Sequence, residues 1–289
     1  MTTTRWRSIS TWLFKLGAYL ALLAVLVPAV WLIGGVVARA VPNFEWDVLW
    51  TPTQGTNGGL ENAILGTFVL MFGVLIVAGS IGVLAGIHLA ELSRPRKSGK
   101  ASGGIFRLAI EVLSGFPSIV LGYVAYVALV VGLNWHFGIL PAVLTLSVLV
   151  IPYIAKGTES ALRQVPNGYR EGAVALGIST GRTLRTIVLK AALPGIATGL
   201  LLALAISGGE TAPLLLTAGW TNQLPSFHLI NQPVAYLTYP VYTFYNDPSH
   251  HAQVLSYDAA LLLIVLVLGL LVSARVIVAR TQRHSEAGA

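Results

Sequence analysis

The chain has 289 residues, of which 55% are hydrophobic and only 10% are charged. A soluble globular domain is about a quarter charged, so this composition excludes an ordinary soluble protein. Cysteine is absent, which excludes disulfides, thiolate metal sites and cysteine nucleophiles. A net charge of +7 would suggest nucleic acid as a partner of a soluble protein, so the positions of the charges decide its meaning.

Long uncharged runs dominate the sequence and predict an all-α integral membrane protein. A helix needs about 20 mostly apolar residues to cross a hydrocarbon core about 30 Å thick. The first run is longer than the apolar core of a secretory signal, about 7–15 residues, so we expect it to be retained. The candidate spans of this single transmembrane domain, 1–289, are about 16–38, 62–90, 108–133, 139–155, 187–218 and 256–274.

The charged residues divide between the two sides of the six predicted spans. One side, with both termini and the second and fourth connections, holds 17 cations and 5 acids, a balance of +12. The other side holds 1 cation and 5 acids, a balance of −4, and Glu210 is left within the fifth span. By the positive-inside rule both termini are cytoplasmic. The charge therefore sets orientation in a lipid bilayer, and we expect no nucleic acid partner.

Motifs for catalysis are absent from the sequence. The nearest match to a G-x-x-x-x-G-K-[ST] phosphate loop is 98–101, which lacks the first glycine and the final hydroxyl residue. No nucleophile, base and orienting group can be assembled. The sequence therefore predicts a protein that is not an enzyme, with no catalytic residues, no metal site and no cofactor of its own.

The cytoplasmic connection 156–186 is longer than a structural link requires. Ala173, Leu176 and Ile178 predict a small apolar face on a short helix, and Gly177 suits the end of that helix. Such a short helix is marginal alone in water and needs a surface to pack on. A groove on a cytoplasmic partner is one such surface, and the lipid interface is the alternative.

The same connection resembles the cytoplasmic EAA signature of ABC importer permeases. Glu171-Gly172-Ala173 is followed by Gly177 and then, after the nine-residue gap of that signature, by Ile187-x-Leu189. Gly172 replaces the usual alanine, and Lys190 replaces the usual proline. In that family this loop forms the coupling helix that docks into the ATPase. The resemblance implies these ATPase-coupling residues: Glu171, Gly172, Ala173 and Gly177.

A second stretch narrows the resemblance to the PstA-type phosphate permeases. The segment 209–215 reads GETAPLL, as in that family, and 115–120 in the third span is also similar to a family segment. Many relatives carry arginine four residues before the glutamate, where this chain has Ile206. The resemblance implies a type I ABC importer permease fold with six transmembrane helices in the bacterial plasma (inner) membrane.

That resemblance also implies partners and an energy source. The family assembles a second, PstC-type permease, a PstB-type ATPase dimer that holds ATP and magnesium, and an external PstS-type phosphate-binding protein. Bringing a dianion into an inside-negative cell costs about 4.6 kcal/mol per 100 mV, so an external energy source is needed. Closure of the ATPase would drive alternating access of the spans.

Glu210 is the acid that lies clearly within a predicted span, and intramembrane acids are functional candidates. It follows Gly208-Gly209 and precedes Pro213, where the helix is expected to deform. Because a carboxylate repels phosphate, it could pair with a cation of the second permease or be protonated. A structural contact between subunits is the alternative. The predicted translocation path or gate comprises Ser207, Gly208, Gly209, Glu210 and Thr211.

Other functions remain open from sequence alone. They are a permease for molybdate or sulfate, an autonomous ion-coupled carrier or channel, and a sensor or scaffold that reports phosphate status. The long outer loop, about 219–255, predicts either an aromatic belt at the membrane surface or a docking surface for an external partner. Its aromatic residues include Trp220, Phe227, Tyr236, Tyr239, Tyr242, Phe244 and Tyr245.

Overall fold

The computed structural model describes residues 2–92, 104–226 and 228–286. Contacts group the chain into two units, Met1–Glu45 and Trp46–Ala289. The first unit contains α1 (Thr2–Ala40), with Pro28 inside it, and the short 3₁₀ helix η1 (Val41–Asn43). The stretch Thr11–Asn43 is long and apolar enough to cross a membrane, in agreement with the first predicted span.

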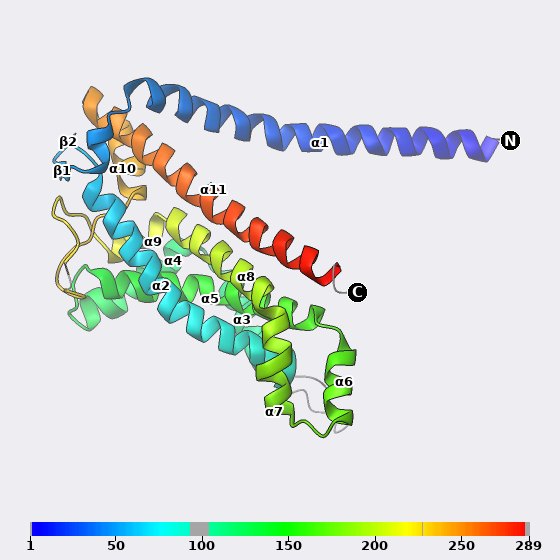
Figure 1. The fold of residues 1–289 in the computed structure, drawn as a ribbon. Helices are drawn as coiled ribbons and strands as arrows, with labels where there is room; N and C mark the ends of the chain where they lie inside the picture. Colours follow the sequence, from blue (N-terminus) through cyan, green and yellow to red (C-terminus); the bar gives the residue numbers. More distant parts are fainter. Residues whose placement is uncertain (1, 93–103, 227, 287–289) are drawn as a thin grey trace. The chain divides into compact units, whose positions relative to one another are not determined.

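The second unit is helical apart from one small hairpin, in which β1 (Thr53–Gln54) pairs antiparallel with β2 (Asn57–Gly58) (Figure 1). Its α-helices are α2 (Glu61–Ile87), α3 (Gly104–Ser114), α4 (Ser118–Ala125), α5 (Ile139–Gln164), α6 (Asn167–Ala175), α7 (Thr180–Thr183), α8 (Leu189–Gly209), α9 (Ala212–Thr217), α10 (Thr238–Thr243) and α11 (His250–Glu286). Short 3₁₀ helices are η2 (Trp46–Leu49) and η6 (Phe244–Asn246), and π-helical segments are η3 (His88–Leu92), η4 (Tyr126–Gly132) and η5 (Leu184–Val188).

Within the described residues, five helices are long and apolar enough to span a membrane singly, and a bent pair makes a sixth candidate. The bent pair occupies the third predicted span, 108–133, which we expected to be one helix. Its halves, Gly104–Ser114 and Ser118–Gly132, meet at an angle of 101°. Pro117 at the break explains the bend, because proline lacks an N–H and disfavours helical backbone in the residue before it.

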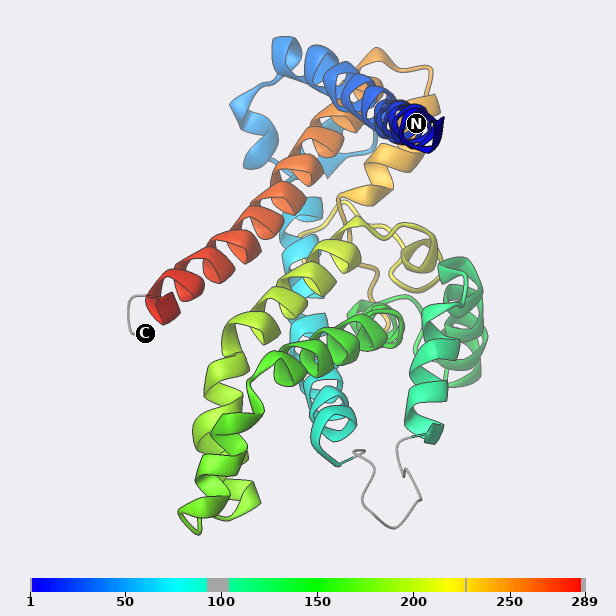
Figure 2. The ribbon, with the colours of Figure 1, turned by 90° about the vertical axis from the view of Figure 1, so that its right-hand side faces the viewer.

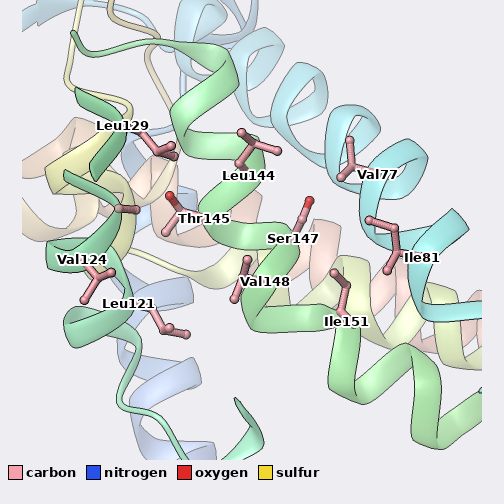
Figure 3. A pocket seen from close by; sticks show the side chains of 11 residues that line it. Val77, Ile81, Leu121, Val124, Leu129, Leu144, Thr145, Ser147, Val148 and Ile151 are labelled. Atoms are coloured by element: carbon pink, nitrogen blue, oxygen red, sulfur yellow. The ribbon is translucent and has the colours of Figure 1, made fainter. Parts of the chain in front are cut away.

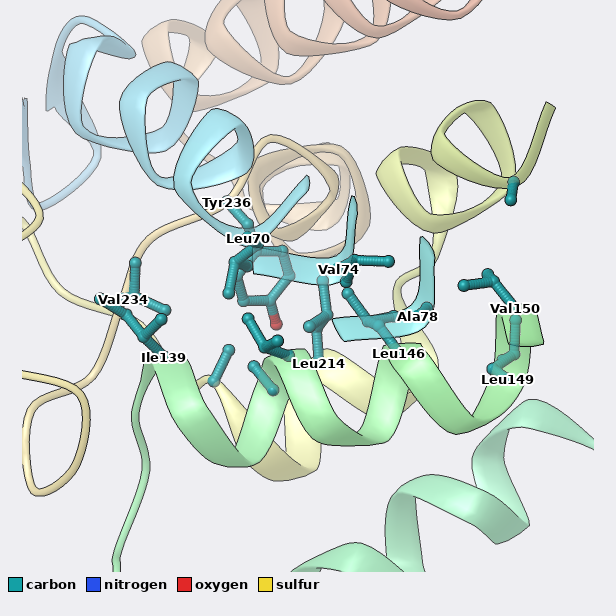
Figure 4. Close-up of a cluster of buried hydrophobic side chains, with 14 of the residues drawn as sticks. Leu70, Val74, Ala78, Ile139, Leu146, Leu149, Val150, Leu214, Val234 and Tyr236 are labelled. Carbon is teal, nitrogen blue, oxygen red and sulfur yellow. The ribbon is translucent and has the colours of Figure 1, made fainter. Parts of the chain in front are cut away.

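Helices α2, α5 and α8 form the centre of the second unit. Leu70, Val74 and Ala78 of α2 face Leu146 and other buried residues of α5 (Figure 4). The two helices approach closely where α2 has glycine. A Cβ at Gly86 would lie 2.6 Å from the carbonyl oxygen of Ala155 on α5, and one at Gly82 would lie 2.7 Å from Ile154 Cβ. Small residues at such crossings are typical of membrane helices.

The connections that we predicted to be cytoplasmic and those that we predicted to be outside lie at opposite ends of the second unit. Helices α6 and α7, from the predicted cytoplasmic connection, lie at one end, and the β hairpin and α10 lie at the other (Figures 1 and 2). Three features of the sequence argument lie outside the described part of the chain: the phosphate-loop match 98–101, four of the cations counted in the second connection (Arg94, Arg96, Lys97 and Lys100), and Phe227 of the outer loop.

The outer end is held together by polar and aromatic contacts. The Thr53 hydroxyl donates to Asn62 Oδ1 at 2.9 Å, and Asn62 Nδ2 donates to the carbonyl of Thr221 at 2.8 Å. The ring of Trp220 stacks on that of Tyr239 with centroids 4.3 Å apart. Several aromatic rings of this part of the outer loop therefore pack against one another, whereas Tyr242 and Tyr245 remain exposed.

Candidate functional site

The fifth predicted span breaks at the place that the sequence indicated. Helix α8 ends at Gly209, and Glu210 adopts an extended backbone with φ −73° and ψ 135°. Helix α9 begins at Ala212 with Pro213 in its first turn. Glycine weakens the end of α8, and proline suits a first helical turn because it has no N–H to be satisfied there.

The backbone groups released by this break find partners within the protein. The Thr238 hydroxyl donates to the carbonyl oxygen of Glu210 at 2.9 Å, and the Glu210 N–H contacts the carbonyl of Ser207 at 3.4 Å. Irregular backbone at membrane depth is tolerated only where such groups are satisfied or line an aqueous path. The outer loop that carries Thr238 therefore stabilises the break.

The two segments that carry the PstA-type resemblance lie against each other at this site. The Ser118 hydroxyl, at the start of α4, lies close enough to the half-buried carboxylate of Glu210 to interact with it. One turn further along α4, a Cβ added at Gly122 would lie 2.6 Å from Pro213 Cα, so only glycine allows this approach. The 101° bend before Ser118 places α4 here. Sequence reasoning did not select Ser118 or Gly122 as site residues, although 115–120 had already been noted as family-like.

The five predicted path residues divide into two groups. Ser207 and Gly208 are buried, and with Tyr236 they line a small internal cavity of about 10 Å³. Gly209 is exposed, and Glu210 and Thr211 are half-buried. The open part of the candidate gate is therefore 209–211, with Ser207 and Gly208 forming its packed support.

The predicted coupling helix is α6, and its end is built as the sequence indicated. Gly177 has a φ of +70°, the left-handed conformation that favours glycine. The N–H of Ile178 bonds to the carbonyl of Ala173 at 2.9 Å, and that of Gly177 bonds to the carbonyl of Val174 at 3.0 Å. These two bonds form a Schellman motif, which satisfies the last carbonyls of the helix.

The apolar face predicted for α6 is corrected by the structure. Ala173 packs inward and is 3% exposed, whereas Leu176 is 80% exposed. The apolar side chains that face outward with Leu176 are Tyr169 and Val174, because the helix is anchored through Ala173. The other predicted coupling residues, Glu171 and Gly172, are exposed, and the space around Gly172 would accept a Cβ freely.

A larger cavity lies elsewhere in the helical body. It has a volume of about 380 Å³ and lies between α2, α4, η4 and α5 (Figure 3). Its walls are hydrophobic apart from the hydroxyls of Thr145 and Ser147. The Thr145 hydroxyl already donates to the carbonyl of Pro141 at 2.6 Å. This lining does not suit a dianion, which needs several hydrogen-bond donors or cations, so the cavity is not a candidate phosphate site.

Comparisons with known proteins agree with this arrangement. Residues 80–283 match the family model described as "Binding-protein-dependent transport system inner membrane component". The chain is 58% identical over 256 residues to the phosphate transport system permease protein PstA 2 of Mycobacterium bovis, covering 89% of this chain and 83% of that protein. It is 35% identical over 254 residues to the phosphate transport system permease protein PstA of Yersinia pestis, covering 87% and 84%.

The fold is also that of a solved ABC transporter chain. A chain of the MetNI methionine ABC transporter, in an inward-facing conformation, matches with a TM-score of 0.57 and 21% identity, over 82% of this chain and 99% of that one. The resemblance expected from the two short segments is thereby confirmed. The chain belongs to the inner membrane components of binding-protein-dependent transport systems, as a permease of the PstA family and not an ATPase.

Proposed function

We propose that this chain is the permease component of an ATP-driven importer of inorganic phosphate in the bacterial inner membrane. The observation that carries the proposal is the 58% identity over 89% of the chain to a phosphate transport system permease. The contact of Ser118 with Glu210 supports it, since it joins the two segments by which the chain resembles that family.

The proposed partners are a PstC-type second permease, a PstB-type ATPase dimer and a PstS-type external binding protein. ATP and magnesium would be held by the ATPase, because this chain has no phosphate loop. The exposed side chains of Tyr169, Val174 and Leu176 are an argument for the proposed docking of the ATPase on α6. A nine-residue helix that, together with its capping residue Leu176, exposes three large apolar groups is typical of a protein interface.

In the proposed cycle, ATPase closure moves α6, and the membrane helices alternate between inward-open and outward-open arrangements. Residues 209–211 line or gate the path at the break between α8 and α9. The Glu210 carboxylate would not bind a phosphate dianion directly, because like charges repel. With the Ser118 hydroxyl as its partner, it instead fixes the shape of the gate.

The test is phosphate uptake by a bacterium that lacks its own high-affinity phosphate permease genes. The chain, expressed with its partner subunits, should restore uptake of radiolabelled phosphate, and a hundredfold excess of molybdate or sulfate should leave that uptake unchanged. Inhibition by molybdate or sulfate would instead assign another oxyanion. Uptake by this chain without the ATPase would indicate an autonomous carrier, and no uptake with normal phosphate signalling would indicate a sensor.

A further inference from the structure

One side chain joins the coupling helix to the body of the protein. Arg170 precedes the exposed Glu171 in sequence, but its own side chain points inward and is 14% exposed. The guanidinium donates to Glu91 Oε1 at 2.7 Å. It also donates to the carbonyl oxygens of Leu162 at 3.0 Å and Val165 at 2.9 Å.

These three acceptors come from two other helices. Glu91 lies in η3, the π-helical continuation of α2, and its side chain is also 14% exposed. Leu162 lies in the last turn of α5, and Val165 is the residue that caps it. Carbonyl groups at a helix end have no partner within the helix and attract cations. Arg170 therefore fastens α6 to the ends of both α2 and α5 at once.

Only arginine has the geometry for this arrangement. Its planar group holds several N–H donors in a fixed fork, whereas lysine presents one flexible ammonium. A charge-assisted hydrogen bond is about twice as strong as a neutral one. Because both the Arg170 and Glu91 side chains are largely shielded from water, this pair is screened less by salt than an exposed pair.

The elements around α6 make such a fastening important for transmitting motion. On its carboxyl side, α6 is followed by a turn at Gly177, the short α7 and then the π-helical η5. Interrupted helices of this kind bend more readily than a continuous α-helix. The α2–α5 pair is instead packed tightly, with Gly86 against Ala155 and Thr158. Besides the short chain connection 165–166 between α5 and α6, the bonds of Arg170 carry a displacement of α6 to that rigid pair.

We propose that Arg170 is a positioning residue that transmits ATPase-driven motion of α6 to α2 and α5 through its bonds to Glu91 and to the end of α5. The inference deepens the proposed function and depends on it. Arg170 is turned away from the outward surface of α6, so its role is distinct from docking. Its loss should leave the ATPase bound and hydrolysing ATP while transport falls.

A second ion pair at the same end of the molecule offers a matched control. Glu159 on α5 contacts Arg107 at 2.7 Å and Arg163 at 2.8 Å. The arginine side chains of these pairs are 50% and 53% exposed, and the Arg163 pair lies within one helix. Exposed pairs of this kind contribute little. Among the described residues, no hydrogen bond or ion pair joins either of them to α6.

The experiment uses the complete complex with its ATPase and binding protein, reconstituted in liposomes. Uptake of radiolabelled phosphate and release of phosphate from ATP are measured together, and their ratio is the readout. Arg170→Ala should lower that ratio by about tenfold, because it removes a shielded charge pair and two further hydrogen bonds. Glu91→Gln keeps the bonds to α5 and should lower it by about threefold. Arg170→Lys should restore part of the ratio, and Arg163→Ala should match the wild type.

The outcomes separate this inference from the proposed function. If the wild-type complex takes up no phosphate, the proposed function fails. If the wild type transports and Arg170→Ala keeps its ratio within twofold, the transmission role is wrong. An equal loss in Arg163→Ala would likewise overturn it, since any ion pair at this end would then matter. If Arg170→Ala does not assemble, Glu91→Gln decides, and a wild-type ratio in that variant contradicts the proposal.

Discussion

The predicted coupling helix α6 and the break between α8 and α9 are stabilised in opposite ways. Helix α6 ends through its own backbone bonds and the left-handed conformation of Gly177, and it leaves Leu176 80% exposed. The break at Glu210 depends on Ser118 and Thr238, which are distant in sequence. The outer surface of α6 should therefore tolerate change without loss of fold, whereas the break should not. This suits a docking element in one case and a gate in the other.

The largest effect is expected where α4 meets α9. Gly122→Ala places a Cβ 2.6 Å from Pro213 Cα, so the helices must move apart. Overpacking of this kind should destabilise the protein by about 1–3 kcal/mol and reduce phosphate uptake strongly. Thermal unfolding in detergent and uptake in cells measure the two effects. Gly115→Ala is the control, because its new Cβ would meet only the carbonyl oxygens of Val112 at 3.6 Å and Glu111 at 3.9 Å, both ordinary contacts.

The next effect concerns the carboxylate at the break. Glu210→Gln should reduce phosphate uptake by about tenfold, because it removes the charge that interacts with the Ser118 hydroxyl. Ser118→Ala should have a smaller effect in the same direction. Glu111→Gln, which changes an exposed carboxylate on α3, should leave uptake unchanged. Wild-type uptake in Glu210→Gln would remove this residue from the gate.

Binding of the ATPase should be weakened by substitutions on the exposed surface of α6 and not by substitutions at the outer end. Leu176→Asp puts a charge on a side chain that is 80% exposed, so the fold should be preserved. Recovery of the ATPase with the affinity-purified permease should fall about tenfold, as expected when an apolar interface anchor is lost. Glu171→Lys should weaken it in the same assay. Leu224→Asp at the outer end is the control, and an equal loss there would show that α6 is not the docking element.

The smallest effects test the helix end itself. Gly177→Ala forces a Cβ into a φ of +70° and should destabilise α6 by about 1–2 kcal/mol. Gly172→Ala adds a methyl group in open space within the helix and should stabilise α6 by about 0.5–1 kcal/mol. Hydrogen exchange of the α6 amides should become faster in the first variant and slower in the second. The opposite order would contradict the assigned helix end.

Sequence predicted the features that depend on neighbouring residues. The spans followed from hydropathy, the end of α6 from Gly177, and the break near Glu210 from the glycines before it and Pro213 after it. The all-α permease fold and the family were confirmed by the comparisons. The assignment of 171–173 and Gly177 to ATPase coupling and of 207–211 to the path stays a prediction.

Sequence did not predict features that depend on distant contacts. The bend at Pro117 was missed because the apolar run continues across it. The prediction that Ala173 and Leu176 share one apolar face was wrong, because helical periodicity does not show which side of a helix packs against the protein. The pairing of Arg170 with Glu91 joins residues 79 positions apart, for which no local pattern exists.

The most direct test of the account is phosphate uptake into liposomes that contain this chain, alone or assembled with a second permease, the ATPase and the binding protein. The account predicts uptake of radiolabelled phosphate only by the full assembly, and only when ATP is supplied on the side of α6. Uptake by this chain alone, or by the assembly without ATP, would contradict it.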